Sequence, residues 1–122
     1  MTTYDIGVFG EEQASKYLKK SKYKIVTRNF KTIFGEVDII ARNKKEIVFV
    51  EVKTRSSKSF ATPAEFVDNE KISRITRVAE FFIKHYKCQL SPRIDVIEVY
   101  ISITGDKYTV ERINHLENVS VE

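Results

Sequence analysis

The chain has 122 residues, of which 42% are hydrophobic and 31% are charged, and this is the size and composition of one domain with a modest core. The net charge is +4, with the basic excess in residues 1–61, which suits a polyanionic partner, although solubility alone also explains scattered lysines. No apolar stretch approaches the ~20 residues of a membrane span, and the lone Cys88, with no secretory or transit pattern, predicts a soluble, cytoplasmic protein.

The amino-terminal half is predicted to form one helix and three strands. Residues 5–21 place apolar side chains at the spacing of one helix face, and these are Ile6, Phe9, Ala14, Tyr17 and Leu18. Residues 23–30 alternate in the manner of a strand, and residues 36–42 and 46–54 are two further β-rich runs. The polar sequence "NKK" separates the last two runs, which predicts a β-hairpin.

A loop and a second helix are predicted next. Residues 56–65 are small and polar and include a proline, so we expect them to form a loop. The helix is predicted from about Asp68, as its cap, to Lys87. Its buried stripe is predicted to comprise Ile72, Ile75, Ala79, Phe82, Ile83 and Tyr86.

The last predicted elements are two strands, residues 93–103 and 107–113, paired around a turn at Gly105 and Asp106. No element is predicted after Asn114. The complete order predicts an α/β protein in which a central mixed β-sheet is flanked by helices within a single domain, residues 1–122. Fold class alone assigns no activity.

Three charged residues lie within the predicted hairpin strands, where the pattern otherwise favours buried apolar residues. A two- or four-residue loop centred between residues 44 and 45 makes Asp38 the partner of Glu51. Directly opposed carboxylates destabilise a sheet, so something must offset their repulsion. The two-residue period of a strand places Lys53 on the same face as Glu51.

A divalent cation shared by Asp38 and Glu51, here called the acid pair, would remove this repulsion. Mg²⁺ favours carboxylates together with waters and phosphate oxygens, and the backbone carbonyl of Val52 would offer a further oxygen ligand. Such a metal supports phosphodiester hydrolysis because it neutralises charge on the phosphoryl oxygens and lowers the pKa of a bound water. Lys53 would hold that water or help to deprotonate it. The pattern therefore predicts a Mg²⁺ site, with Mn²⁺ as a substitute.

Two simpler interpretations compete with a metal site. The same register places Glu36 opposite Lys53, which would be an ordinary cross-strand ion pair worth ~0.2–1 kcal/mol. Alternatively, the acid pair would be solvated on an open sheet face. Against this, Ile47 and Phe49 share the face of Glu51, and an exposed face is not expected to carry large apolar side chains.

An acidic residue on one strand followed by Glu-x-Lys on the next resembles the pattern of the PD-(D/E)XK, or restriction-endonuclease-like, nucleases. The whole chain resembles the YraN-like family of uncharacterised predicted endonucleases. The motifs that carry this resemblance are "GEEQASKYL" (10–18), "RNF" (28–30), "GEVDIIAR" (35–42), "VFVEVKTR" (48–55), "TPAEFV" (62–67), Lys71 and "RIDVI" (93–97).

The resemblance implies a restriction-endonuclease-like fold with Asp38, Glu51 and Lys53 at the active site. It adds Glu11, which matches the first-helix Glu of the family's "GExxA" pattern. Archaeal Holliday-junction resolvases have a similar first-helix Glu, and there it approaches the metal. A competing interpretation makes Glu11 an exposed first-turn acid that complements the helix dipole. The neighbouring Glu12 is not expected to take part.

Several basic residues are candidates for contacts with nucleic-acid phosphates. Arg55 continues the face of the acid pair, and Lys71 and Arg74 descend one side of the second helix, where a solvated helix face is the alternative. His85 and His115 have no Cys or second His at ligand spacing, so a zinc site is not predicted.

Together these features predict a Mg²⁺-dependent nuclease that acts on DNA or a branched nucleic acid, with the acid pair as metal ligands, Lys53 assisting water and Glu11 as an auxiliary acid. Two other classes stay open. One is a non-catalytic module that binds nucleic acid or a protein partner on the same fold, and the other is a structural protein that tolerates the acid pair. The sequence also leaves open whether the active form is a homodimer that cuts both strands.

Overall fold

The computed structural model describes residues 3–56 and 69–120. Within these ranges the elements are α1 (Thr3–Lys20), β1 (Lys24–Thr32), β2 (Gly35–Arg42), β3 (Glu46–Ser56), α2 (Asn69–Tyr86), β4 (Ser91–Thr104) and β5 (Lys107–Leu116). This order confirms the predicted helix, three strands, helix and two strands. The predicted loop lies outside the described residues except for Ser56, which ends β3, and the predicted cap Asp68 also lies outside them. Neither described helix is long and apolar enough to cross a membrane.

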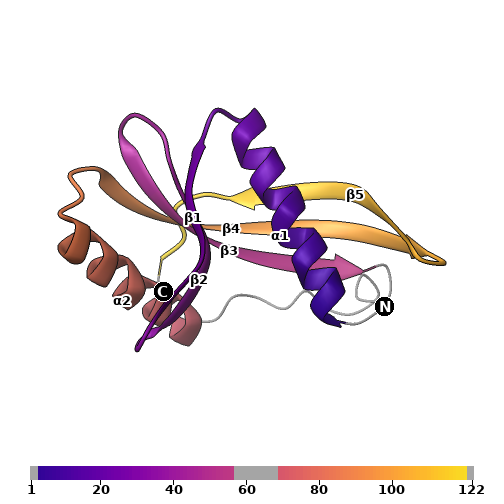
Figure 1. The fold of residues 1–122 in the computed structure, drawn as a ribbon, viewed down its shortest axis with the longest axis horizontal. Helices are drawn as coiled ribbons and strands as arrows, with labels where there is room; N and C mark the ends of the chain where they lie inside the picture. The colour runs from indigo at the N-terminus through magenta and orange to yellow at the C-terminus, as the bar shows by residue number, and fades with distance from the viewer. Residues whose placement is uncertain (1–2, 57–68, 121–122) are drawn as a thin grey trace.

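The strands form one mixed sheet in the order β1-β2-β3-β4-β5 (Figure 1). Strands β3 and β4 run parallel, while the other neighbouring strands are antiparallel. A parallel pair requires a crossover connection, and α2 belongs to the connection between β3 and β4. The two helices pack on opposite faces of the sheet. The predicted α/β class, with a central mixed sheet flanked by helices, is therefore confirmed.

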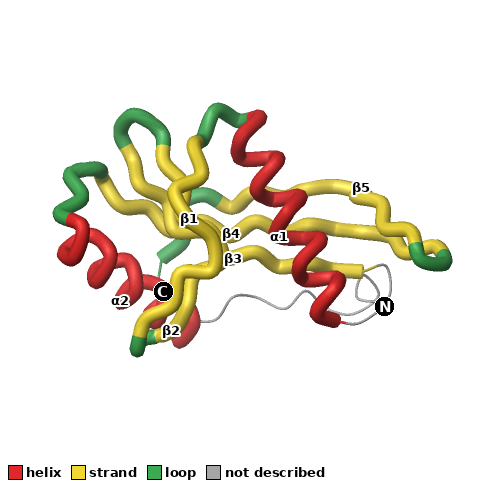
Figure 2. The backbone as a smooth tube through the Cα atoms, in the orientation of Figure 1, coloured by secondary structure: helices red, strands yellow, loops and turns green. Residues whose placement is uncertain are grey.

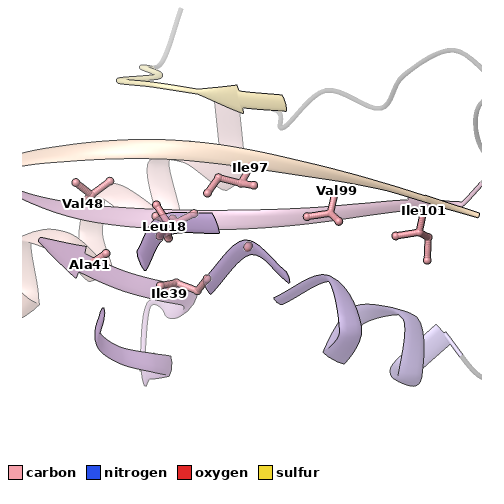
Figure 3. Close-up of a cluster of buried hydrophobic side chains, with 9 residues drawn as sticks. Leu18, Ile39, Ala41, Val48, Ile97, Val99 and Ile101 are labelled. Atoms are coloured by element: carbon pink, nitrogen blue, oxygen red, sulfur yellow. The ribbon is translucent and has the colours of Figure 1, made fainter. Parts of the chain in front are cut away.

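Each face of the sheet has its own hydrophobic core because alternate residues of β3 point to opposite sides. Val48 and Val50 face α1 and belong to one buried cluster. Figure 3 shows Val48 in this cluster with Leu18, Ile39, Ala41, Ile97, Val99 and Ile101. Ile47 and Phe49 face α2 and belong to a second cluster with Ile75, Val78, Ala79 and Phe82. Figure 2 shows that β4 and β5 extend away from α2 toward the opposite end of the molecule.

Two details of the sequence prediction are wrong. Tyr86, predicted within the buried stripe of α2, is 57% exposed because it lies in the last turn, beyond the buried part of the helix. The chain after Asn114 is not without structure, since β5 continues to Leu116. The Val119 N–H then donates a hydrogen bond to the carbonyl of Ile94 at 2.8 Å. Pairing with β4, rather than any periodicity of its own, orders this segment.

Candidate active site

The β2–β3 hairpin has the predicted register and opens at the acid pair. Its Cα partners, among them Ile39 with Val50, are those of a hairpin centred between residues 44 and 45. The ladder stops at this pair, one position before Asp38 and Glu51. There Asp38 Oδ2 accepts a hydrogen bond from the Val52 N–H at 2.8 Å. The Asp38 carboxylate thus replaces a backbone carbonyl of β2 as the hydrogen-bond acceptor for β3.

A bend in β1 and β2 coincides with this opening. Asn29, with a φ of 52°, and Asp38 lie between the ladder pairs Arg28–Ile39 and Phe30–Val37. Asparagine tolerates this left-handed conformation better than most residues do. Beyond the bend, Val37 packs in the same core as Ile40, although strict alternation would turn the two to opposite faces. Asp38 therefore occupies the irregular position of β2.

The acid pair opens into one cavity of about 250 Å³. Its lining comes from β2, β3 and the beginning of α2, and consists of Gly35, Glu36, Asp38, Glu51, Lys71, Arg74 and Ile75. Although the Glu51 side chain borders this cavity, it is only 7% exposed. The two acids consequently lie on the same side of the sheet, close to basic residues of α2.

Burial raises the pKa of both members of the acid pair. For Glu51, the neighbouring Asp38 carboxylate raises the pKa further, whereas Lys71 and, more weakly, Lys53 lower it. For Asp38, burial outweighs the hydrogen bond from the Val52 N–H and the charge of Lys71, both of which lower the pKa. Ionising both acids therefore costs free energy, and a bound cation would reduce that cost.

Glu11 approaches the acid pair from α1, on the other face of the sheet. Burial raises its pKa and the Asp38 carboxylate raises it further, whereas Arg28 lowers it. Glu11 and Asp38 are thus near enough to interact, which the resemblance implies, although Glu11 is not among the described residues that line the cavity. The neighbouring Glu12 is exposed and lines a separate cavity with Asp106.

The two basic residues that follow Glu51 on its face have different surroundings. Lys53 is half-buried and stands beside Glu98 in the β3–β4 ladder. Arg55 is 9% exposed, and its Nε and Nη2 atoms both lie 3.1 Å from Glu98 Oε2. Asn114 donates a further hydrogen bond to the same carboxylate at 2.8 Å. The guanidinium predicted to contact phosphates is therefore held in a buried ion pair, which is costly to break.

Lys71 and Arg74, here called the α2 rim, reach the cavity from the first turns of α2. Lys71 Nζ lies 3.0 Å from Glu51 Oε1. Arg74 lines the same cavity but pairs with Glu70 at 2.9 Å, one helical turn away. Both residues border the space in front of the acid pair, and Lys71 forms an ion pair with one of its members, Glu51.

Two features of the cavity could not be predicted from the pattern. Gly35 lines it with a φ of 135°, a conformation that glycine adopts without strain. Glu36 also lines the cavity, and its Oε2 atom lies 3.8 Å from Lys31 Nζ of β1.

Because the β2–β3 ladder ends at Ile39, Glu36 and Lys53 are not ladder partners. The interpretation of Glu36 and Lys53 as an opposed cross-strand ion pair is therefore wrong.

The oxygen atoms around the acid pair fit a hard cation. The Val52 N–H points toward β2, and the N–H and C=O of one residue point to the same side of a strand. The Val52 carbonyl therefore also faces β2, beyond the last ladder pair. Two carboxylates and a carbonyl, completed by water and phosphate, suit Mg²⁺. Within residues 3–56 and 69–120 no cluster of three or more His, Cys, Asp or Glu side chains is arranged to hold a metal.

Comparison with known proteins identifies relatives over most of the chain. Residues 10–99 match the model of the Uncharacterised protein family UPF0102. A UPF0102 protein of Caldanaerobacter subterraneus subsp. tengcongensis is 46% identical over 115 residues, covering 93% of this chain and 92% of that protein. UPF0102 proteins of Caldicellulosiruptor saccharolyticus and Clostridium acetobutylicum are each 44% identical, over 94% and 89% of this chain and 98% and 90% of their own lengths. The chain therefore belongs to UPF0102, the YraN family that its motifs resemble.

Proposed function

We propose that this protein is a Mg²⁺-dependent nuclease that hydrolyses phosphodiester bonds in DNA or a branched nucleic acid. The observation that carries the proposal is the position of Asp38 and Glu51, from neighbouring strands, in one cavity beside the α2 rim. Burial raises the pKa of both acids, and the Asp38 carboxylate raises that of Glu51 further, which is an unfavourable arrangement unless a cation uses the pair. The same arrangement, with Glu11 on the preceding helix, supports the further proposal that the fold is restriction-endonuclease-like.

Each side chain has a role that follows from its place. Asp38, Glu51 and the Val52 carbonyl would hold the cation, which would stabilise charge on the phosphoryl oxygens and lower the pKa of a water. Lys53, on the face of Glu51, holds the attacking water. Glu11 acts as an auxiliary acid behind Asp38, and the α2 rim contacts substrate phosphates, which position a nucleic acid without specifying its sequence.

The test is cleavage of plasmid, single-stranded and four-way-junction DNA in Mg²⁺ or Mn²⁺, with EDTA as the metal-free condition. Asp38→Asn is expected to reduce the rate at least ~100-fold, as loss of a charge-stabilising group does, and Lys53→Ala about 10²–10⁴-fold. Glu11→Gln is expected to cost about 10–100-fold, the usual effect of a supporting residue. Glu12→Gln, on the same helix but beside the other cavity, is the matched control and should leave the rate unchanged.

The outcomes separate the classes of function left open by the sequence. Loss of cleavage with DNA binding intact, in variants that keep their circular dichroism and melting temperature, supports catalysis. Binding without cleavage in either metal would instead favour a non-catalytic nucleic-acid-binding module. Cleavage that survives both Asp38→Asn and Lys53→Ala would point to a contaminating nuclease and remove the proposal's basis.

A further inference from the structure

Lys71 forms an ion pair inside the proposed metal site. Its Nζ lies 3.0 Å from Glu51 Oε1, and the Lys71 side chain is 36% exposed while that of Glu51 is 7% exposed. The lysine stem therefore comes from the open side of the cavity, and its charged end reaches an acid that is shielded from water. The Lys71 charge also acts on Asp38. One ammonium group thus partly neutralises both members of the acid pair.

The charge balance of this region explains why a counter-ion is needed. Glu36 lines the same cavity, and Glu11 interacts with Asp38 from the other face of the sheet. Four carboxyl groups consequently act on a part of the hairpin where the ladder has already stopped. Like charges at such positions destabilise a sheet. Lys31 lies beside Glu36, and Arg28 acts on Glu11. For the acid pair itself, Lys71 is the base that acts on both members, with a weaker effect of Lys53 on Glu51.

We infer that Lys71 competes with the metal for the acid pair: its ammonium group neutralises Glu51 and Asp38 until a divalent cation displaces it. The inference rests on the proposed function, because it requires the acid pair to bind a metal. Mg²⁺ binds carboxylate oxygens at about 2.0–2.1 Å, and its charge repels an ammonium group that shares the same oxygen. The two cations therefore exclude each other at Glu51 Oε1.

Displacement from Glu51 would free the Lys71 side chain to contact substrate. The lysine side chain is a point charge on a flexible four-carbon stem, and it remains anchored on the α2 rim after it leaves Glu51. From there its charge can move to a substrate phosphate at the cavity mouth. Metal binding would in this way release the basic group that the substrate needs, and Lys71 would link the two binding events.

The experiment measures Mn²⁺ binding to the full chain by isothermal titration calorimetry. Lys71→Met removes the charge and keeps most of the stem, so it is expected to tighten Mn²⁺ binding about tenfold, which corresponds to ~1.4 kcal/mol of removed competition. Arg74→Met removes a charge from the same rim, but Arg74 pairs with Glu70 rather than with the acid pair. Its effect on Mn²⁺ affinity should therefore stay below about threefold, because an exposed charge that is not paired with a metal ligand is screened by salt. A merely structural role for Lys71 predicts no gain in metal affinity.

Each outcome decides something. The first case is that the wild type binds Mn²⁺, Asp38→Asn abolishes this binding, and Lys71→Met binds Mn²⁺ equally or more weakly than the wild type. This result overturns the inference and leaves the proposed function standing. Absence of Mn²⁺ binding in both wild type and Lys71→Met overturns both. If Lys71→Met does not fold, nuclear magnetic resonance of the wild type replaces it: the side-chain signal of Lys71 must shift on addition of Mg²⁺ while that of the exposed Lys84 does not. An unmoved Lys71 signal contradicts displacement.

Discussion

Asp38 accepts a hydrogen bond from the Val52 N–H at 2.8 Å, yet burial raises its pKa. Between the ordinary pKa of about 3.9 and the raised folded-state pKa, the folded protein holds more protons than the unfolded chain. The free energy of unfolding therefore falls as pH rises through this window. Asp38→Asn keeps a hydrogen-bond acceptor and removes the charge, so in EDTA at pH 7 it should stabilise the fold by ~0.2–1 kcal/mol, the size of a like-charge cross-strand effect.

Urea denaturation of wild type and Asp38→Asn at several pH values checks this expectation. The two curves should converge as pH falls below the unfolded-state pKa of about 3.9, where the wild-type carboxyl becomes protonated in both states. Glu12→Gln, which changes an exposed acid away from the cavity, should show no such pH-dependent gain. A less stable Asp38→Asn protein at pH 7 would mean that the charge itself supports the hairpin.

The same residue shows what the sequence can and cannot predict about the site. The proximity of Asp38 and Glu51 on one side of the sheet is predictable because turn length sets hairpin register and strand period sets the face, although the two are not ladder partners. The bond to the Val52 N–H is not, since it forms beyond the last pair of the β2–β3 ladder, where regular strand pairing no longer sets the geometry. The Lys71 ion pair depends on how α2 packs on the sheet, which no local pattern encodes.

At the scale of elements, Gly10 determines how closely α1 approaches β3. A Cβ on Gly10 would overlap the hydroxyl of Thr54, and Glu11, the next residue, interacts with Asp38. Gly10→Ala should therefore push α1 away from the sheet and cost about 1–3 kcal/mol of overpacking, more than the ~1 kcal/mol that alanine gains in a helix. Thermal and urea unfolding measure the loss, and the cleavage assay should show a decrease close to that of Glu11→Gln.

Gly7→Ala is the matched control, because a Cβ at that position of the same helix meets nothing within 4 Å. It should stabilise the protein by about 0.5–1 kcal/mol through helix propensity alone. Thr54→Ala should recover part of the Gly10→Ala loss in the double variant, since the two positions share one contact. Equal gains from Gly7→Ala and Gly10→Ala would show that the close approach does not exist in solution.

Element order was the most predictable property of this chain, and the burial of individual charges the least. Apolar stripes on α1 and alternation in β3 are local patterns, and the structure places both as expected. Arg55 shares a face with Glu51, which a strand pattern can predict. Its burial against Glu98 and Asn114 requires two later strands to be laid beside β3, and a local pattern holds no information about that.

At the scale of the whole molecule, a buried polar network joins elements that are far apart in sequence. Asp95 of β4 is fully buried and accepts two hydrogen bonds from Arg93, at 2.9 and 2.8 Å. Its Oδ2 atom lies 2.6 Å from His115 Nε2 of β5, and the other ring nitrogen lies 3.0 Å from the Tyr17 hydroxyl of α1. Arg93 also donates to the hydroxyl of Tyr23, the residue before β1. The network therefore connects α1, β1, β4 and β5.

Asp95 should accordingly be a main source of acid sensitivity. Burial would raise its pKa, but hydrogen bonds from His115, Arg93 and the Asn118 N–H outweigh burial and lower it. A lowered folded-state pKa contributes stability above the ordinary pKa of about 3.9, and that contribution is lost as pH falls toward the folded-state value. Asp95→Asn removes one of the carboxylates paired with Arg93, which keeps Glu46 at 2.8 Å and Glu117 at 3.2 Å, so urea denaturation at pH 7 should show a loss of about 1–3 kcal/mol. This loss in the free energy of unfolding should shrink below about pH 4, where the wild type loses the same contribution. The control Glu80→Gln, on the exposed side of α2, should stay near wild type at every pH. A deficit independent of pH would assign the effect of Asp95→Asn to packing rather than to charge.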